Sequence, residues 1–138
     1  VVVQTRMKDN PAIVMASKGQ VEAFFDNELK LRRDLGFPPF SRMVNLVVRS
    51  PKAEVARGFA ESLASELSGK AAFFGFDVQV YGANECPIEK IKANFRFQVL
   101  LRSFKPSDML SLLENVLSYT SVPSSVVLEI DVDPVDLL

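Results

Sequence analysis

The chain of 138 residues is long enough for one domain with a buried core, and its 48% hydrophobic content is typical of a globular protein. It has one cysteine, Cys86, and no histidine, which excludes an internal disulfide, the usual zinc sites and the commonest general base. We therefore expect no catalytic and no metal-binding residues in this chain. No apolar run approaches the ~20 residues of a membrane-spanning helix, so we expect a cytoplasmic protein with no membrane partner.

The net charge of −1 hides a gradient along the chain. Residues 1–50 carry a net charge of +3, residues 51–102 a net charge of +1 and residues 103–138 a net charge of −5. This balance is too mild for a stand-alone nucleic-acid-binding protein, which is usually clearly basic. The gradient favours a module that contributes one part of a larger binding surface.

Residues 1–18 are expected to be a connector from an upstream domain. The Val1–Thr5 segment predicts a short buried strand, and no turn or cap precedes it. Because an isolated strand would leave its edges unpaired, we expect this segment to be the end of a domain in a longer protein. Asn10-Pro11 then predicts the start of a helical turn, since proline is favoured at the first helical position.

Residues 19–40 are expected to form a bridging helix followed by a turn. The apolar residues of the helix recur with helical spacing and are Val21, Phe24, Phe25, Leu29, Leu31 and Leu35. Gly36 stands where a left-handed helix cap belongs, and Pro38-Pro39 prevents the helix from continuing. Phe37 and Phe40 flank the prolines, so we expect the turn to pack onto the core.

Residues 41–138 are expected to form the main domain, in which strands and helices follow one another. The expected elements are a strand at 42–49, a helix capped by Ser50 with Pro51 at its first position and closed by Gly69, a strand at 77–81, an irregular connection at 82–91, a strand at 95–102, a helix beginning at 106–108 and a strand at 126–132. Pro134 stops the last strand.

This order of elements is strand, helix, strand, strand, helix, strand. It predicts an α+β fold of the ferredoxin-like βαββαβ type, a four-stranded antiparallel sheet with both helices on one face, preceded by an extra N-terminal helix. The strands at 42–49 and 95–102 are central in that topology. Their polar faces should therefore merge on the side without helices.

A row of polar side chains on this sheet face is the candidate binding site. Arg96, Gln98 and Arg102 project from one face of their strand with the spacing of alternate residues, roughly 7 Å. The full set of expected DNA-binding residues is Arg96, Gln98, Arg102, Lys90, Lys92 and Arg42. Arginine offers bidentate geometry to phosphate, and lysine offers a point charge.

The competing interpretation is a solvated sheet face, or ion pairs between these cations and Glu129 or Asp131 on the last strand. Aromatic side chains on the same face would favour nucleic acid, because bases stack on them. Phe95 and Phe97 have the wrong parity for that role.

Two other groups of charged residues have alternative interpretations. Lys30, Arg32 and Arg33 complement the dipole at the end of the first long helix, or bind an acidic partner. Asp131 and Asp133 share a face, but two carboxylates without a third ligand are better explained as charges that protect an edge strand. The sequence has no glycine-rich phosphate loop and no Walker lysine motif, so we expect no nucleotide site.

Several segments together resemble one protein family. The segments are Val3-Gln4-Thr5 followed by Asn10-Pro11-Ala12-Ile13, then FDNELKLRRDLGFPPF at 25–40, Phe95-Arg96-x-Gln98-x-Leu100-Leu101, and the closing Asp131-Val132-Asp133-Pro134. In this order they resemble the C-terminal end of the primosomal replication-restart DNA helicases, the PriA family (primosomal protein N-prime). The sequence departs from the family pattern at Ala93, where the family usually has glycine, and at Glu85-Cys86-Pro87, where the family has an Ala-Pro-rich loop.

The resemblance implies that the parent protein is an ATP-dependent 3′-to-5′ DNA helicase of replication restart and primosome assembly. It implies a non-catalytic C-terminal domain that helps to bind branched and single-stranded DNA at stalled forks. The alternative is a docking module for the acidic tail of the single-stranded-DNA-binding protein, and the upstream helicase lobes are implied as further partners. ATP, Mg and Zn sites are expected only upstream of this chain. An unrelated ligand-sensing domain of the same fold is a third alternative, although the sequence has no pocket signature.

Overall fold

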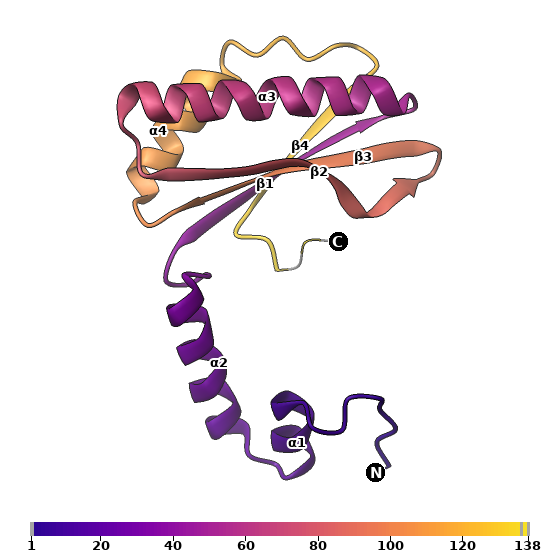
Figure 1. The fold of residues 1–138 in the computed structure, drawn as a ribbon, viewed down its shortest axis with the longest axis vertical. Helices are drawn as coiled ribbons and strands as arrows, with labels where there is room; N and C mark the ends of the chain where they lie inside the picture. Colours follow the sequence, from indigo (N-terminus) through magenta and orange to yellow (C-terminus); the bar gives the residue numbers. More distant parts are fainter. Residues whose placement is uncertain (1, 136, 138) are drawn as a thin grey trace. The chain divides into compact units, whose positions relative to one another are not determined.

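A computed structural model of the chain describes residues 2–135 and 137. They form two compact units, one ending at Phe40 and the other beginning at Ser41 (Figure 1). The first unit contains helices α1 (Pro11–Ser17) and α2 (Val21–Leu35). The side chain of Asn10 caps α1 by accepting a hydrogen bond of 2.9 Å from the N–H of Ala12.

The start of the first unit differs from the prediction. Val2 and Val3 form no strand and are exposed, so the expected buried strand at 1–5 is wrong for the residues that the structure describes, and Val1 lies outside them. The physical reason is that the described part of the first unit contains no strand with which this segment could pair. Its interpretation as the end of an upstream domain stays a prediction.

Helix α2 ends as its sequence predicts but leaves its apolar side exposed. Gly36 adopts a left-handed conformation with φ of 65°, and its N–H closes the last turn. None of the residues of α2 is buried. Phe37 is also exposed, contrary to the expectation that the turn packs onto the core, whereas Phe40 is half-buried with the guanidinium carbon of Arg33 4.7 Å from its ring centroid.

The second unit has the predicted α+β ferredoxin-like fold. Its elements are β1 (Arg42–Ser50), α3 (Ala53–Phe74), β2 (Val78–Ile91), β3 (Asn94–Ser103), α4 (Pro106–Leu117) and β4 (Val127–Val132). The four strands lie in the order β2-β3-β1-β4, and every neighbouring pair is antiparallel. Strands β1 and β3 are therefore central, and α3 runs along one face of the sheet (Figure 1).

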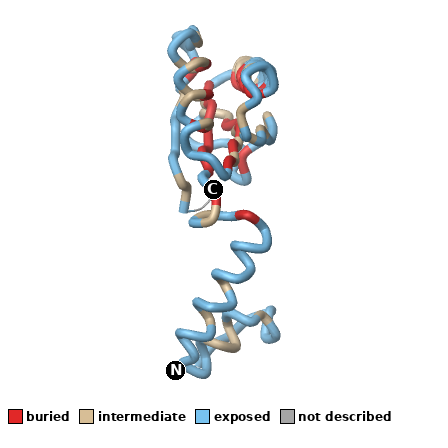
Figure 2. Tube along the Cα trace, turned by 90° about the vertical axis from the view of Figure 1, so that its left-hand side faces the viewer, coloured by how far each residue is buried: buried red, intermediate tan, exposed pale blue. Residues whose placement is uncertain are grey.

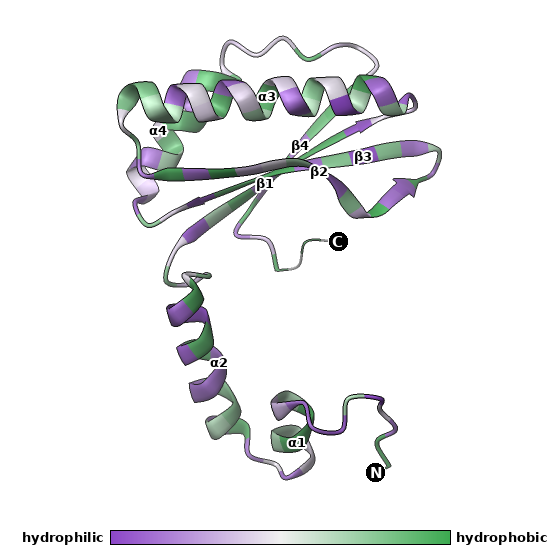
Figure 3. Ribbon diagram, in the orientation of Figure 1, coloured by the Kyte–Doolittle hydropathy of each residue, from purple (hydrophilic) through white to green (hydrophobic). Residues whose placement is uncertain are grey.

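The core lies between the sheet and the two helices of this unit, where buried residues concentrate (Figure 2). On the inner face of the sheet, Val44, Leu46 and Val48 of β1 lie opposite Leu101, Val99 and Phe97 of β3. Hydrophobic and hydrophilic residues alternate along α3 and the strands (Figure 3). Burial of one face of each strand against the helices fixes the register, because a slip by one residue would turn the apolar side chains to the opposite face.

Three element boundaries differ from the prediction. Ser50 remains in β1 because it pairs with Phe95, so α3 begins only at Ala53. Helix α3 continues through Gly69, where a Cβ would meet open space, and ends at Gly75, which has φ of 66°. Strand β2 extends to Ile91 with two shifts of register, where the sequence predicts an irregular connection.

Candidate nucleic-acid interface

The face of the sheet opposite α3 and α4, which we call the open face, carries the polar side chains of β3. In the register of the sheet, Arg102 lies opposite Met43, Gln98 opposite Val47 and Arg96 opposite Arg49. Met43, Asn45 and Val47 are buried in the middle of this face. Glu129 and Asp131 of β4 form its acidic edge. The open face is thus a mixed surface, in which the polar side chains predicted from β3 lie beside the buried Met43 and Val47 and the carboxylates of β4.

Arg96 does not project into solvent. Its relative exposure is 9%, and its Nη1 lies 3.4 Å from the carbonyl oxygen of Ile88, to which it donates. Strand β2 loses its regular register between Glu85 and Lys90, and this part of β2 curves to the side of the sheet away from α3 (Figure 1). The expected exposure of Arg96 is therefore wrong, because an irregular segment of the neighbouring strand covers it.

Cys86, in this same segment of β2, is buried at 2% exposure. Burial raises the pKa of the Cys86 thiol, and the positive charge of Arg96 offsets part of this rise. The thiol therefore stays protonated at neutral pH and is a poor nucleophile. The burial of both Arg96 and Cys86 indicates that the irregular part of β2, between Glu85 and Lys90, is well packed.

The centre of the open face is nearly neutral. The side-chain amide of Asn45 donates to Oε1 of Gln98 at 3.4 Å, and Gln98 is half-buried. Arg49 forms an ion pair with Glu129. Glu129 of the last strand thus neutralises Arg49, a cation that is not among the predicted DNA-binding residues.

Arg102 forms the centre of a group of four side chains at one end of the sheet, which we call the Arg102 cluster: Gln79, Tyr81, Arg102 and Phe104. Nε and Nη2 of Arg102 donate to Oε1 of Gln79 at 3.0 and 2.6 Å. The hydroxyl of Tyr81 donates to the same oxygen at 2.6 Å. The guanidinium carbon lies 5.7 Å from the ring centroid of Tyr81 and 5.9 Å from that of Phe104.

The two rings of the Arg102 cluster are accessible. Tyr81 is 42% exposed and Phe104 is 55% exposed, while Arg102 is half-buried between them. A cation held between accessible aromatic faces can contact phosphate while bases stack on the rings. The hydrogen bonds to Gln79 orient the guanidinium on the open face.

The remaining cations of the predicted DNA-binding set lie elsewhere. Lys90 and Lys92 lie at the hairpin between β2 and β3, about 26 Å along β3 from Arg102 at the usual rise per residue. The ammonium of Lys90 lies 4.5 Å from the ring centroid of Phe95. Arg42 has the parity of Val44 and lies on the helix side of the sheet, where it forms an ion pair with Asp133. Its expected place on the open face is wrong.

Comparisons with known proteins show the family of this chain. The family model described as "Primosomal protein N C-terminal domain" matches residues 33–135. The chain belongs to this family. A protein of Treponema pallidum named Replication restart protein PriA is 33% identical over 138 residues, which is 100% of this chain and 20% of the relative. Relatives with the same name in Borreliella burgdorferi and Bacillus subtilis are 27% and 24% identical, over 100% and 97% of the chain. The chain spans about a fifth of the length of these curated relatives.

Tyr81 and Phe104 belong to the Arg102 cluster but are not among the binding residues predicted from the sequence. Tyr81 has the parity of Gln79 and not that of Val78 and Val80, which was a signal for the open face. Its position beside Arg102 depends on the pairing of Gln79 with Arg102 across β2 and β3. No periodicity within one strand reveals that pairing.

The predicted partner-binding residues, Lys30, Arg32 and Arg33, lie in the last turns of α2. Arg32 forms an ion pair of 2.7 Å with Glu28 and donates to the carbonyl oxygen of Pro38 at 3.2 Å. Arg33 lies over the ring of Phe40, and Lys30 is exposed. Their positions in the last turns agree with the helix-dipole interpretation. A role in binding an acidic partner stays a prediction.

Of the two carboxylates that could suggest a metal pair, Asp131 lies in β4 and Asp133 directly follows the end of this strand. Asp133 binds Arg42 and accepts a hydrogen bond of 3.2 Å from the N–H of Met43. Across residues 2–135 and 137, no group of three or more His, Cys, Asp or Glu side chains could hold a metal ion. Over the same residues, every helix is too short or too polar to cross a membrane.

Proposed function

We propose that this domain binds single-stranded or forked DNA through the Arg102 cluster, as a non-catalytic part of a replication restart protein. The observation that carries the proposal is the guanidinium of Arg102 between the accessible rings of Tyr81 and Phe104. The names of the relatives support replication restart as the process. The family resemblance adds an ATP-dependent 3′-to-5′ helicase as the parent and stalled forks as the site of action.

The chemistry of the Arg102 cluster suits a single strand better than a duplex. The bases of a single strand are unpaired, so their faces can stack on Tyr81 and Phe104. Arg102 can contact a phosphate between two stacked bases, since its position is set by Gln79. These contacts recognise backbone and ring faces, and they predict binding with little preference for sequence.

The acidic edge of the sheet limits the strength of this binding. Glu129 and Asp131 lie on β4 at the edge of the open face, and both are exposed. They repel phosphate, so the strand is expected to follow β2 and β3 and to avoid β4. Weak binding is consistent with a domain that supplies part of a larger DNA-binding surface.

The function is tested by fluorescence anisotropy of the 138-residue chain with a labelled forked oligonucleotide. We expect weak binding at low salt that falls as salt rises, with a log–log slope of about −0.7, because the one phosphate contact of Arg102 releases its counterion. The Arg42→Ala variant is the matched control, since Arg42 lies on the helix side of the sheet. Absence of binding even at low salt would contradict the proposal.

A second candidate function is the docking of an acidic peptide, such as the tail of the single-stranded-DNA-binding protein. The observation in its favour is a cavity of about 220 Å³ that combines one cation with an apolar lining. Its lining residues are Arg42, Val44, Pro106, Met109, Leu110, Leu113 and Val132. An acidic peptide with an apolar side chain would match this combination, if its carboxylate replaced Asp133 at Arg42.

Titration of the ¹⁵N-labelled chain with an acidic tail peptide, followed by NMR, separates the two functions. Peptide docking predicts chemical shift changes at Leu110 and Leu113 and none at Tyr81. Titration with single-stranded DNA should give the opposite pattern. Peptide-induced changes confined to Lys30, Arg32 and Arg33 would move the peptide site to the end of α2.

A further inference from the structure

Three phenylalanines gather where α3 ends and β2 begins, and we call them the α3-end cluster: Phe73, Phe74 and Phe76. Phe73 and Phe74 meet edge to face with ring centroids 5.0 Å apart, and Phe74 and Phe76 stack at 5.3 Å. Phe73 is 80% exposed and Phe74 is 45% exposed. Only Phe76 packs against the hydrophobic core. Two large aromatic side chains are thus exposed side by side.

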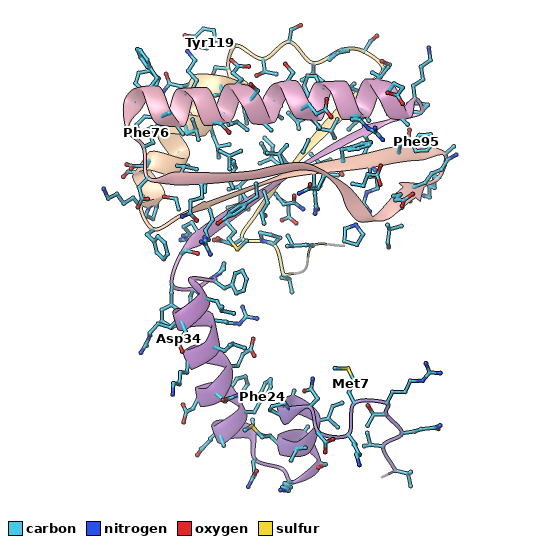
Figure 4. All side chains as sticks on the ribbon, viewed as in Figure 1. Met7, Phe24, Asp34, Phe76, Phe95 and Tyr119 are labelled. Carbon is cyan, nitrogen blue, oxygen red and sulfur yellow. The ribbon has the colours of Figure 1, made fainter. Side chains whose placement is uncertain are left out.

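The α3-end cluster lies at the same end of the sheet as the Arg102 cluster. Val78 pairs with Ser103, Phe76 precedes Val78 by two residues, and Phe104 follows Ser103 directly. The Cα atoms of Phe76 and Phe104 are therefore at most about 16 Å apart. Figure 4 shows Phe76 where α3 ends. A stacked single strand of about five nucleotides covers this distance.

We propose that single-stranded DNA bound by the Arg102 cluster continues around this end of the sheet and stacks its bases on the α3-end cluster. This inference rests on the proposed function and extends it to a second set of contacts. A base can stack on each exposed ring whatever its identity. The ammonium of Lys70 lies 6.0 Å from the ring centroid of Phe74, where it can attract the phosphate backbone.

The space beside these rings also fits a nucleotide. A cavity of about 360 Å³ lies next to Phe76, and its lining includes Ser68, Gly75 and Val78. Gly75 ends α3 in a left-handed conformation, which brings Phe76 back beneath Phe74. Such a cavity beside stacked rings can receive a base or sugar from the strand.

DNA is inferred as the partner of the α3-end cluster from the charges at this end of the sheet and from the proximity of the Arg102 cluster. Lys70, Arg102 and Lys105 are found at this end of the sheet, and two of these cations lie over aromatic rings. Asp77 and Asp108 offset two of these three positive charges, and Asp108 accepts a hydrogen bond of 2.9 Å from the N–H of Asp77. Cations that lie over exposed aromatic rings, next to a proposed DNA site, favour DNA as the partner over an apolar protein surface.

The test compares short and long oligothymidylates, about 3 and about 15 nucleotides, binding to the full 138-residue chain by fluorescence anisotropy, because the short one cannot reach both clusters. We expect Phe73→Ala to weaken binding of the long oligonucleotide about five-fold or more and to leave binding of the short one nearly unchanged. The double variant Tyr81→Ala/Arg102→Ala should weaken binding of both. Phe25→Ala is the matched control, because Phe25 is an equally bulky exposed residue on α2 in the first unit.

The outcomes separate this inference from the proposed function. Equal affinity of Phe73→Ala and the unsubstituted chain for the long oligonucleotide overturns the inference, while the loss caused by Tyr81→Ala/Arg102→Ala still supports the function. An equal loss in Phe25→Ala also overturns it, since the effect would not be specific to the α3-end cluster. If the unsubstituted chain binds neither oligonucleotide, the proposed function and the inference both fail.

Discussion

Replacement of Tyr81 and Arg102 together by alanine is expected to weaken binding of single-stranded DNA by about thirty-fold or more. Loss of one base-stacking ring costs about 1–3 kcal/mol of binding free energy, and loss of one charge-assisted phosphate contact adds about 1 kcal/mol. Each 1.4 kcal/mol corresponds to about ten-fold in affinity. Anisotropy titration with labelled oligothymidylate at low salt measures the change.

Tyr81→Phe provides the matched control for this double variant. It removes the hydroxyl that donates to Gln79 but keeps the ring that would stack on a base. We expect Tyr81→Phe to bind DNA with nearly the affinity of the unsubstituted chain, and thermal unfolding should show that both variants fold. Unchanged binding by a folded Tyr81→Ala/Arg102→Ala variant would rule out the Arg102 cluster as the DNA site.

Arg96→Ala is expected to lower the free energy of unfolding of the second unit by about 1–3 kcal/mol. Arg96 is buried beneath β2, and its removal leaves a cavity and deprives the carbonyl oxygen of Ile88 of a donor. In a domain of this size, each 1 kcal/mol lowers Tm by about 4–8 °C. Thermal unfolding followed by circular dichroism measures this shift.

DNA binding should change little in Arg96→Ala when it is measured well below the new Tm. Arg102→Ala should show the reverse pattern, with weaker DNA binding and a Tm within a few degrees of the unsubstituted chain, because Arg102 is only half-buried. A Tm unchanged in Arg96→Ala together with lost DNA binding would restore the interpretation of Arg96 as an exposed phosphate ligand.

Strand β3 shows which structural features can be predicted from the local sequence pattern and which cannot. The alternation of Phe97, Val99 and Leu101 with polar residues predicted which side chains enter the core, because side chains alternate across a strand with a period of two. All three are buried. The same alternation placed Arg96 on the opposite face but could not show whether that face is open, since the answer depends on a segment of β2 that precedes β3 in the chain.

The ends of helices were also predicted correctly in one case and wrongly in another. Gly36 was predicted correctly as a helix cap because two prolines follow closely and forbid further helix. Gly69 was predicted as a cap but lies within α3, because the buried residues Leu67 and Ala71 on either side hold the helix against the sheet. Burial of an apolar face thus outweighs the low helix propensity of a glycine.

Local sequence patterns were enough to predict the order of strands and helices in the second unit, the core face of each central strand and the family. These features follow from periodicity, turn residues and motifs that are local in the chain. Which polar residues reach solvent, and which of them contact one another, depends on how the strands pair and pack. Arg96 is covered by a shifted segment of β2, and Arg102 joins Tyr81 through pairing between strands. Such contacts join residues about twenty positions apart or turn on irregular register, and no local pattern encodes them.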